Sequence, residues 1–343
     1  MAIKVYNRIS KIKGLWEQLF SKNPTLTYFQ SYEWNQCLEN RFKSLHFIKY
    51  RNCKIRYIVC NDELIAPLVI NEAEHHINMV GHDESSDYLT FIHGPMSVEC
   101  LKKDIKEVLI TYRNYHFQLS KINEIFPMRE AMEKLISDEI KCIETHSAAC
   151  VHVFTDYDTS LYNNMGKSKR QNYRTALNRM EKDGHKYIIE TGFKKVDKKL
   201  SQKLYKLYFQ RRYDCDEQPS GRLKQLYYRV RYRIGISSFG DRQDVLSNYA
   251  KRKPVFLSSI FIDGNLAAFC EGAYSNDGKI ICIARVATHS DYYKYSPGFV
   301  LLVNTIDKVK DQIRVFDLTR GTESYKFDLN GVKHLNYSYQ IET

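Results

Sequence analysis

The sequence predicts a mixed α/β protein built from two domains. Its 343 residues exceed the length that one hydrophobic core ordinarily serves, and a hydrophobic content of 43% is enough for two cores. Segments with strand-like and helix-like apolar spacing alternate along the chain. A short internal match supports duplication, because residues 58–66 and 260–268 place Ile, Leu and Ala at the same offsets.

The first half begins with helices and continues with strands. Apolar spacing predicts helix over residues 10–40, with a loop around Pro24. The strand-like runs are Leu45–Tyr50, Ile55–Cys60, Leu64–Ile70 and His76–Val80, and the further helices are Val98–Thr111 and Met128–Ile136. A new strand follows Cys150, so we place a boundary there, between domains 1–150 and 151–343.

The second half opens with a predicted helix, Tyr162–Lys182, which Gly184 is suited to end. A second helix is marked by Leu200, Leu204, Leu207 and Tyr208. The next predicted strands are Val255–Ile262, Leu266–Tyr274 and Ile280–Thr288. Asp263 and Gly264 join the first two, and this dipeptide is typical of a type I′ hairpin turn.

Residues 292–326 carry the most informative pattern. Ser296 suits an N-cap, and Pro297 suits the first position of the helix that follows. A strand over Ile313–Leu318 comes next, and then a polar cluster over residues 320–326. A strand, a small-residue turn and a helix N-terminus can together hold a phosphate group, because free N–H groups and the helix dipole face the anion.

The charge is unevenly distributed. Residues 1–150 hold 19 basic and 19 acidic residues, whereas residues 161–260 hold 24 and 9, a net charge of +15. Such a field favours an anionic partner, for which the candidates are coenzyme A, a nucleotide-sugar, anionic lipid headgroups at a membrane surface, and tRNA. A solvated basic surface is the alternative.

Other classes of protein are disfavoured. The nine cysteines form no CxxC pair and the histidines no HExxH motif, so we expect reduced thiols and no bound metal. The sequence contains no apolar run long enough for a transmembrane segment and no signal-peptide pattern at its start. We therefore expect a cytoplasmic protein.

Four short motifs, in this order, resemble the CelD-like/FemAB-like branch of the Gcn5-related N-acetyltransferase (GNAT) superfamily. They are FQSYEW at Phe29–Trp34, GHDESSDY at Gly81–Tyr88, KRQNYR at Lys169–Arg174, and YSPG at Tyr295–Gly298 with DLTRG at Asp317–Gly321 and Tyr325-Lys326. The resemblance implies two GNAT-like units in tandem, each a mixed, mostly antiparallel sheet flanked by helices. It also implies acetyl-CoA or another acyl-CoA as co-substrate.

The resemblance also implies where the donor binds. The strand before the turn is expected to diverge from its neighbour and to present Val286, Ala287 and Thr288 to the acyl-pantetheine. The expected diphosphate contacts are Lys294, Tyr295, Ser296, Pro297 and Gly298. The turn is shorter than the loop of ordinary GNAT proteins, so fewer N–H groups can converge on a diphosphate. The alternative is a plain helix start.

The predicted catalytic residues follow the last strand. By resemblance to FemAB-like transferases, Lys326 stabilises developing charge. Tyr325 is a proton donor to the oxyanion or the leaving thiolate, and Glu323 a proton acceptor. Glu271 is an alternative base with Arg285 as its partner, and the two equally suit a structural ion pair. The alternative for the whole cluster is a surface salt-bridge network.

The remaining candidates would bind the acceptor. Arg170, Tyr173 and Arg174 form a basic helix that can clamp phosphate or carboxylate, Arg320 follows the last strand, and Arg285 is a further basic candidate. The resemblance places Trp34, Asp87 and Tyr88 on the first-domain side of the cleft. For each of these residues an ordinary core or surface position is the alternative.

Three functions remain open. The first is an acyl-CoA-dependent N-acyltransferase acting on an amino group of a sugar or cell-envelope polysaccharide precursor, an anionic small molecule or sugar-nucleotide acceptor. The second is a FemAB-like transferase that takes its acyl group from aminoacyl-tRNA. The third is a non-catalytic basic binding module, although the sequence shows no RNA-recognition signature.

Overall fold

The computed structural model describes residues 2–47, 49–83, 85–138, 140–215, 221–223, 225–227, 230 and 242–342. The chain divides into two compact units. Unit 1 comprises Met1–Cys150, Ser275–Asp277 and Lys333–Thr343, and unit 2 comprises Val151–Tyr274 and Gly278–Val332. The domain ranges 1–150 and 151–343 stay a prediction, since a compact unit need not be a domain.

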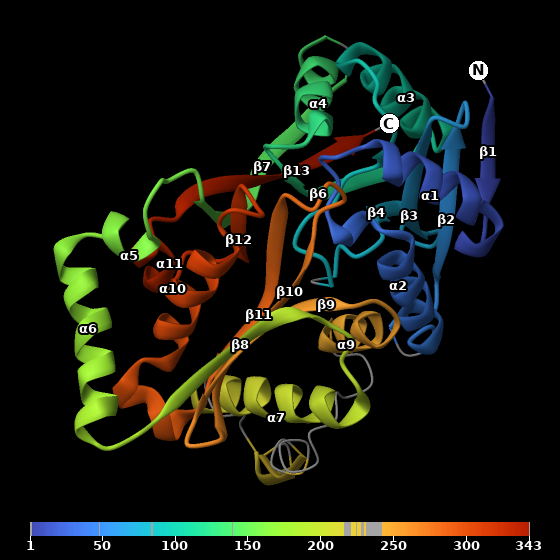
Figure 1. Cartoon of the computed structure of the whole chain (residues 1–343). Coiled ribbons are helices and arrows are strands. Elements are labelled where there is room, and N and C mark those ends of the chain that lie inside the picture. Colours follow the sequence, from blue (N-terminus) through green and yellow to red (C-terminus); the bar gives the residue numbers. More distant parts are fainter. Residues whose placement is uncertain are drawn as a thin grey trace. The chain divides into compact units, whose positions relative to one another are not determined.

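Unit 1 is a mixed sheet with helices packed on it (Figure 1). Its strands are β1 (Ile3–Tyr6), β2 (Cys53–Cys60), β3 (Leu64–Asn71), β4 (His76–Met79), β5 (Ile92–His93), β6 (His116–Asn123), the first part of β7 (Cys142–Phe154) and most of β13 (Val332–Glu342). Its helices are η1 (Ile9–Ile12), α1 (Lys13–Lys22), η2 (Tyr28–Gln30), α2 (Tyr32–Ser44), α3 (Val98–Thr111) and α4 (Pro127–Asp138). The order is β1-β2-β3-β4-β6-β13-β7, and β4 pairs with β6 in parallel.

Unit 2 is likewise a mixed sheet with helices packed on it. Its strands are the end of β7, β8 (Tyr187–Lys194), β9 (Val255–Ile262), β10 (Asn265–Tyr274), β11 (Ile280–Thr288) and β12 (Val315–Arg320). Its helices are α5 (Leu161–Asn164), α6 (Lys167–Lys182), α7 (Lys198–Cys215), α9 (Arg242–Arg252), η3 (Ser290–Tyr295), α10 (Pro297–Val309) and α11 (Ser324–Asp328). The order is β7-β12-β11-β10-β9-β8; β11 and β12 are parallel, while β8 to β11 form antiparallel pairs.

The two units repeat one order of elements. In unit 1, antiparallel β2, β3 and β4 are followed by α3 and by β6, parallel to β4; in unit 2, β9, β10 and β11 are followed by α10 and by β12. The sequence match falls on equivalent positions, because Ile58 pairs with Ala66 and Ile260 pairs with Ala268. The predicted fold class is confirmed.

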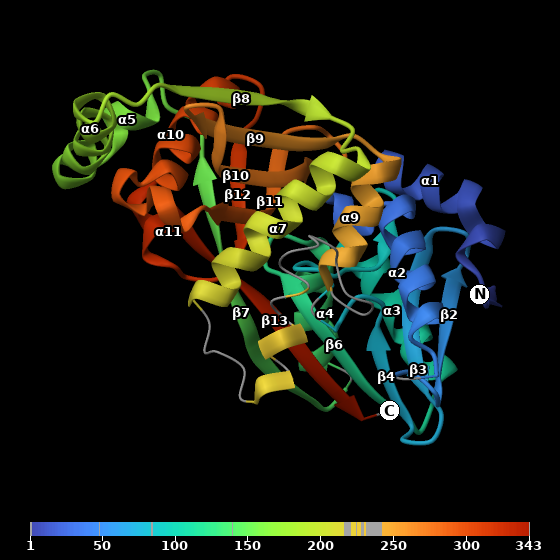
Figure 2. The ribbon, with the colours of Figure 1, turned by 90° about the horizontal axis from the view of Figure 1, so that it is seen from below.

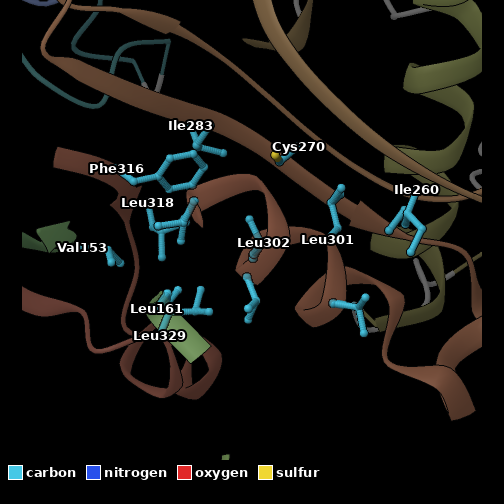
Figure 3. Packing of buried hydrophobic residues seen from close by; sticks show 14 of the residues in the cluster. Val153, Leu161, Ile260, Cys270, Ile283, Leu301, Leu302, Phe316, Leu318 and Leu329 are labelled. Atoms are coloured by element: carbon cyan, nitrogen blue, oxygen red, sulfur yellow. The ribbon is translucent and has the colours of Figure 1, made fainter. Parts of the chain in front are cut away.

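Helix α10 organises the core of unit 2. It lies between α6 and the sheet (Figure 1) and buries its apolar face against β9, β10 and β11. Figure 3 shows Leu301 and Leu302 of this helix gathered with Phe316 and Leu318 of β12. Each fully buried leucine contributes about 1.5–3 kcal/mol by leaving water. The apolar spacing that predicts this helix therefore also fixes its position on the sheet.

Helix α7 lies across one face of the sheet of unit 2 (Figure 2), and α10 packs on the other. Cys270 belongs to the core that α10 covers, so the next residue of β10, Glu271, points to the opposite face. Its cross-strand partner Arg285 lies there, with its guanidinium carbon 6.0 Å from the ring centre of Tyr208 in α7.

Strand β11 contains a β-bulge at Ala284. Arg285 pairs with Glu271 and Ile283 with Gly272, so the residue between them is extra on its strand. A Cβ atom on Gly272 would lie 2.1 Å from the carbonyl oxygen of Cys282. Glycine is therefore required where the two backbones approach at the bulge.

Four element predictions are wrong in detail. The strand expected to begin after Cys150 is the end of β7, which begins at Cys142. The described residues of 45–50 form turns instead of a strand, because α2 extends to Ser44 and the N–H of Leu45 bonds back to Arg41. The helix expected over Tyr162–Lys182 is broken, since Gly166 is extended with ψ 152°. The strand expected over Ile313–Leu318 is β12, two residues further on.

Candidate active site

The turn between β11 and α10 begins the site. Ser296 adopts a left-handed conformation (φ 46°, ψ 47°), and Pro297 occupies the first turn of α10 as predicted. The hydroxyl of Ser296 makes no capping hydrogen bond, although the sequence favours one. The reason is conformational, because a capping side chain requires an extended backbone at that position.

This turn offers one backbone donor to a ligand. The N–H of Ser296 bonds to Tyr293, and those of Phe299 and Val300 bond to Ser296. Pro297 has no N–H. Among the described residues of this turn, the N–H that has no hydrogen-bond partner is therefore that of Gly298. A Cβ atom on Gly298 would lie 2.6 Å from Oγ1 of Thr288, which explains the glycine.

The ladder between β11 and β12 ends before it reaches this turn. Their ladder pairs Ile280–Cys282 with Val315–Asp317 and ends there within the described residues. Beyond it, Thr319 adopts a positive φ of 52°, and its hydroxyl donates to the carbonyl of Ile283 at 2.9 Å. The predicted contacts Val286, Ala287 and Thr288 lie in the part of β11 beyond this ladder.

A pocket of about 260 Å³ lies beside the N-terminus of α10. It is lined by Asn172, Thr175, Ala176, Arg179, Ser296, Phe299, Tyr325 and Asp328. The structure thus brings the predicted residues Ser296 and Tyr325 together. The four residues from α6 were missed, although their spacing of i, i+3, i+4 and i+7 marks one helix face.

Arg179 joins α6 to the turn. Its Nη1 donates to the carbonyl of Lys294 at 3.1 Å. Asp183 accepts from Nζ of Lys294 at 2.9 Å and from the hydroxyl of Tyr295 at 2.7 Å. The hydrogen bond from Lys294 lowers the pKa of Asp183, and the same bond raises the pKa of Lys294. Tyr295 itself is buried in the core of unit 2.

Lys326 is buried behind the end of β12. Its ammonium donates to the carbonyls of Thr319, Arg320 and Gly321 at 3.3, 2.8 and 3.2 Å, and it lies 3.1 Å from the carboxylate of Glu323. These contacts engage all three N–H donors of the ammonium. The arrangement closes the turn between β12 and α11, and the catalytic role of Lys326 stays a prediction.

The other members of this cluster differ in exposure. Glu323 precedes α11 with about half of its side chain exposed, and its carboxylate lies over Gly321, where a Cβ atom would be 2.4 Å from Oε2. Tyr325 is half-buried and lines the pocket. Arg320 is half-buried at the end of β12.

Glu271 and Arg285 form a buried ion pair. The carboxylate Oε2 accepts from Nε of Arg285 at 3.0 Å and also from Nη2. Glu271 Oε1 and Arg285 Nη1 are also buried, and within the described residues neither has a hydrogen-bond partner. The pair predicted from the sequence is therefore formed, and whether it is structural or catalytic stays open.

The basic helix α6 holds three predicted acceptor contacts. Nη1 of Arg170 donates to the carbonyls of Asn163 and Met165 at 3.0 and 2.9 Å, and so it caps α5. The hydroxyl of Tyr173 accepts from Asn304 at 2.8 Å, while Arg174 is exposed. Their binding roles stay predictions.

The predicted residues of the first half belong to unit 1. Trp34 and Tyr88 are buried there. The indole N–H of Trp34 donates to Ser86 at 2.9 Å, and the carbonyl of Tyr88 accepts from Gln30 at 3.0 Å. Asp87 is half-exposed, and its carbonyl accepts from Asn336. Burial of Trp34 and Tyr88 favours core roles for them.

Unit 2 thus combines a bulged strand, a parallel neighbour whose ladder with it is short, and a helix that starts after the turn beyond that ladder. These features define a GNAT-type acyltransferase fold. Residues 167–327 match the family model described as an acetyltransferase (GNAT) domain, which bears out the resemblance to the GNAT superfamily over this part of the chain. No curated protein matches the sequence.

Solved structures share the fold at low identity. The C-terminal domain of a putative lysylphosphatidylglycerol synthetase from Agrobacterium fabrum aligns with a TM-score of 0.58 and 9% identity, over 98% of this chain and 93% of that one. L-PGS from Bacillus licheniformis gives 0.53 and 13%, over 89% and 91%. FemX gives 0.52 and 10%, over 100% and 98%.

Two further observations concern the described residues alone. None of their helices combines the length and apolar character needed to cross a membrane. Their histidine, cysteine and carboxylate side chains form no group of three or more that could hold a metal ion.

Proposed function

We propose that this protein is an N-acyltransferase that takes its acyl group from acyl-CoA and transfers it to an amino group of a sugar or cell-envelope polysaccharide precursor. The observation that carries the donor assignment is the pocket at the N-terminus of α10, where Ser296, Arg179 and Tyr325 meet. The acceptor class comes from the family resemblance.

Most polar groups around this pocket suit a diphosphate, and Asp328, the carboxylate in its lining, is paired with Lys169. The N–H of Gly298 and the positive end of the α10 dipole favour negative charge, and Arg179 adds a guanidinium. A single free N–H is fewer than a diphosphate receives at a glycine-rich loop. Arg179 and the exposed Lys294 would supply the remaining positive charge.

When bound, the thioester supplies an activated acyl group. The end of β11, beyond its ladder with β12, would align the acyl chain through backbone groups. Tyr325 stays our candidate to donate a proton to the leaving thiolate, a role proposed from its phenol group and its place after the last predicted strand. Glu323 is our preferred acceptor for the proton of the attacking amine, because it is exposed, whereas Glu271 is fully buried.

The second candidate donor is aminoacyl-tRNA. The net charge of +15 over residues 161–260 favours it, since a nucleic acid would neutralise this field. The single free N–H at the α10 turn also suits a ligand other than a diphosphate.

Titration calorimetry with acetyl-CoA tests the donor. We expect the wild-type protein to bind acetyl-CoA and Arg179→Gln to bind it about tenfold more weakly, because one charge-assisted contact is lost. Lys182→Gln is the matched control: it lies on the same helix, outside the pocket, and loses the same charge. Its affinity should stay within about twofold of wild type.

The tRNA alternative has a different signature. Tight tRNA binding that falls steeply with salt, together with no heat of binding for acetyl-CoA, would replace acyl-CoA by aminoacyl-tRNA as the donor. Binding of acetyl-CoA without transfer to any amine would favour a non-catalytic module.

A further inference from the structure

A second pocket of unit 2 lies on the face that α7 covers. It measures about 460 Å³ and lies between α7, the start of β10 and the turn after β11. The wall from α7 consists of Lys203, Lys206, Leu207 and Gln210, again at i, i+3, i+4 and i+7. Residues at this spacing lie on one face of a helix, so all four side chains point the same way.

The pocket is held together by specific contacts. The amide of Gln210 donates to the hydroxyl of Ser290 at 3.2 Å, which ties α7 to the turn after β11. The N–H of His289 bonds to the carbonyl of Ala267 at 2.8 Å, which ties the same turn to β10. Leu207 and Leu266 are buried beneath the polar residues.

The polar lining favours an anion. Lys203 and Lys206 carry two positive charges on exposed side chains, and Asn265, Gln210 and His289 add hydrogen-bonding groups. The one carboxylate in the lining, Asp291, is 77% exposed and lies 3.8 Å from the ring of His289. Two ammonium groups on one wall match the charge and the oxygen atoms of a phosphate.

The two pockets share one connecting segment and no lining residue. His289, Asp291 and Tyr292 line the second pocket, while Ser296 lines the first, at the start of α10. A ligand in each would meet opposite sides of the segment between β11 and α10.

We propose that this second pocket binds a phosphate or diphosphate group of the acceptor. The assignment to the acceptor rests on the proposed function, in which acyl-CoA occupies the first pocket. Phosphate binding by itself does not depend on that function. The proposal also accounts for part of the positive charge of residues 161–260, because both lysines belong to that segment.

Titration calorimetry with inorganic pyrophosphate at low ionic strength tests the site. We expect wild-type protein to bind pyrophosphate at this pocket and also at the first one. Lys203→Gln/Lys206→Gln should weaken one of these two sites at least tenfold and leave the other, which Arg179→Gln weakens. Lys198→Gln/Lys199→Gln is the matched control: it removes two exposed lysines from the same helix outside the pocket. Its affinity should stay within about twofold of wild type. Thermal unfolding checks that each variant folds. If a double variant does not fold, its two single variants are titrated in its place.

The outcomes separate the two proposals. Equal losses in both double variants, or no binding by the wild type, would overturn the phosphate site. Loss of acetyl-CoA affinity in Lys203→Gln/Lys206→Gln would assign the phosphate to the donor and so overturn the acceptor site. Failure of the wild type to bind acetyl-CoA would refute the proposed donor, yet leave the pyrophosphate result standing.

Discussion

At the scale of single residues, Gly272 controls the geometry of β11. Any side chain here would meet the carbonyl of Cys282 at the bulge. We expect Gly272→Ala to lower the free energy of unfolding by about 2 kcal/mol or more, because neighbouring backbone must move. Gly192→Ala is the control, since its Cβ would meet open space on β8. Urea denaturation of both variants measures the difference; equal stabilities would show that the bulge tolerates a side chain.

Substitutions of Glu271 and Arg285 distinguish a structural role of this ion pair from a catalytic one. Removing one partner leaves an uncompensated buried charge, so Glu271→Ala should cost about 3–5 kcal/mol of stability. Glu271→Leu/Arg285→Met should recover most of that loss, since an apolar pair needs no counter-charge. If this double variant folds and keeps full transferase activity, the pair is structural; if it folds without activity, one of the two takes part in the reaction.

Substitution of Lys326 likewise distinguishes a structural role from a catalytic one. Lys326→Met should lower the free energy of unfolding by about 2 kcal/mol, because three carbonyls, one buried and two partly buried, lose their common donor. The control Lys308→Met alters an exposed lysine of α10 and should change stability little. Activity of Lys326→Met, measured where the variant is fully folded, decides the catalytic role: wild-type turnover there would exclude it.

At the scale of elements, the largely buried carboxylate of Asp83 fastens α2 in unit 1 through its ion pair with Arg41. Burial opposes ionisation of Asp83, but the charge of Arg41 and hydrogen bonds from Tyr50, Arg41 and Ser85 outweigh it, and they hold its pKa well below 3.8. A carboxyl whose pKa is depressed in the folded state stabilises the fold above its unfolded pKa. That contribution is lost as the pH falls below about 4, through the folded pKa.

Asp83→Asn should therefore be less stable than wild type at pH 7, and the gap should narrow as the pH is lowered from about 4 toward the folded pKa. Urea denaturation over a pH series measures the gap. A gap that stays constant over that range would mean that Asp83 does not titrate with folding.

Helices and hairpins with clear local signals were predictable. Pro297 and the apolar face of α10 predict that helix, and Asp263 and Gly264 both take the positive φ that a type I′ turn requires. The elements that were not predicted include short and edge segments, but also the interior strands β6 and β13 and the helix α9. The exposed edge strand β8 has no clean alternation of buried and exposed residues, and α11 has only five residues, too few for a helical period.

The candidate site was predictable only in part. Ser296 and Tyr325 share a pocket, as their position along the chain suggests. Arg179 was missed because the spacing of polar residues on α6 does not show which other element lies opposite that face of the helix. The carbonyl partners of Lys326 depend on how the turn after β12 folds, and no local pattern of side chains encodes that.

At the scale of the whole molecule, sequence and fold agree on duplication. Each unit contains an antiparallel three-strand set followed by a helix and a parallel strand, and the paired Ile and Ala positions coincide. The charge does not repeat, since residues 1–150 are neutral and the second half carries the whole excess of +12. We therefore place the anionic ligands in unit 2.

A crystal structure of the protein with bound coenzyme A tests this account most directly. We predict that the diphosphate accepts the N–H of Gly298 beside Arg179, and that the pantetheine passes Tyr325 toward the end of β11 beyond its ladder with β12. Coenzyme A bound away from the α10 N-terminus, or a crystal that excludes it at saturating concentration, would contradict the account.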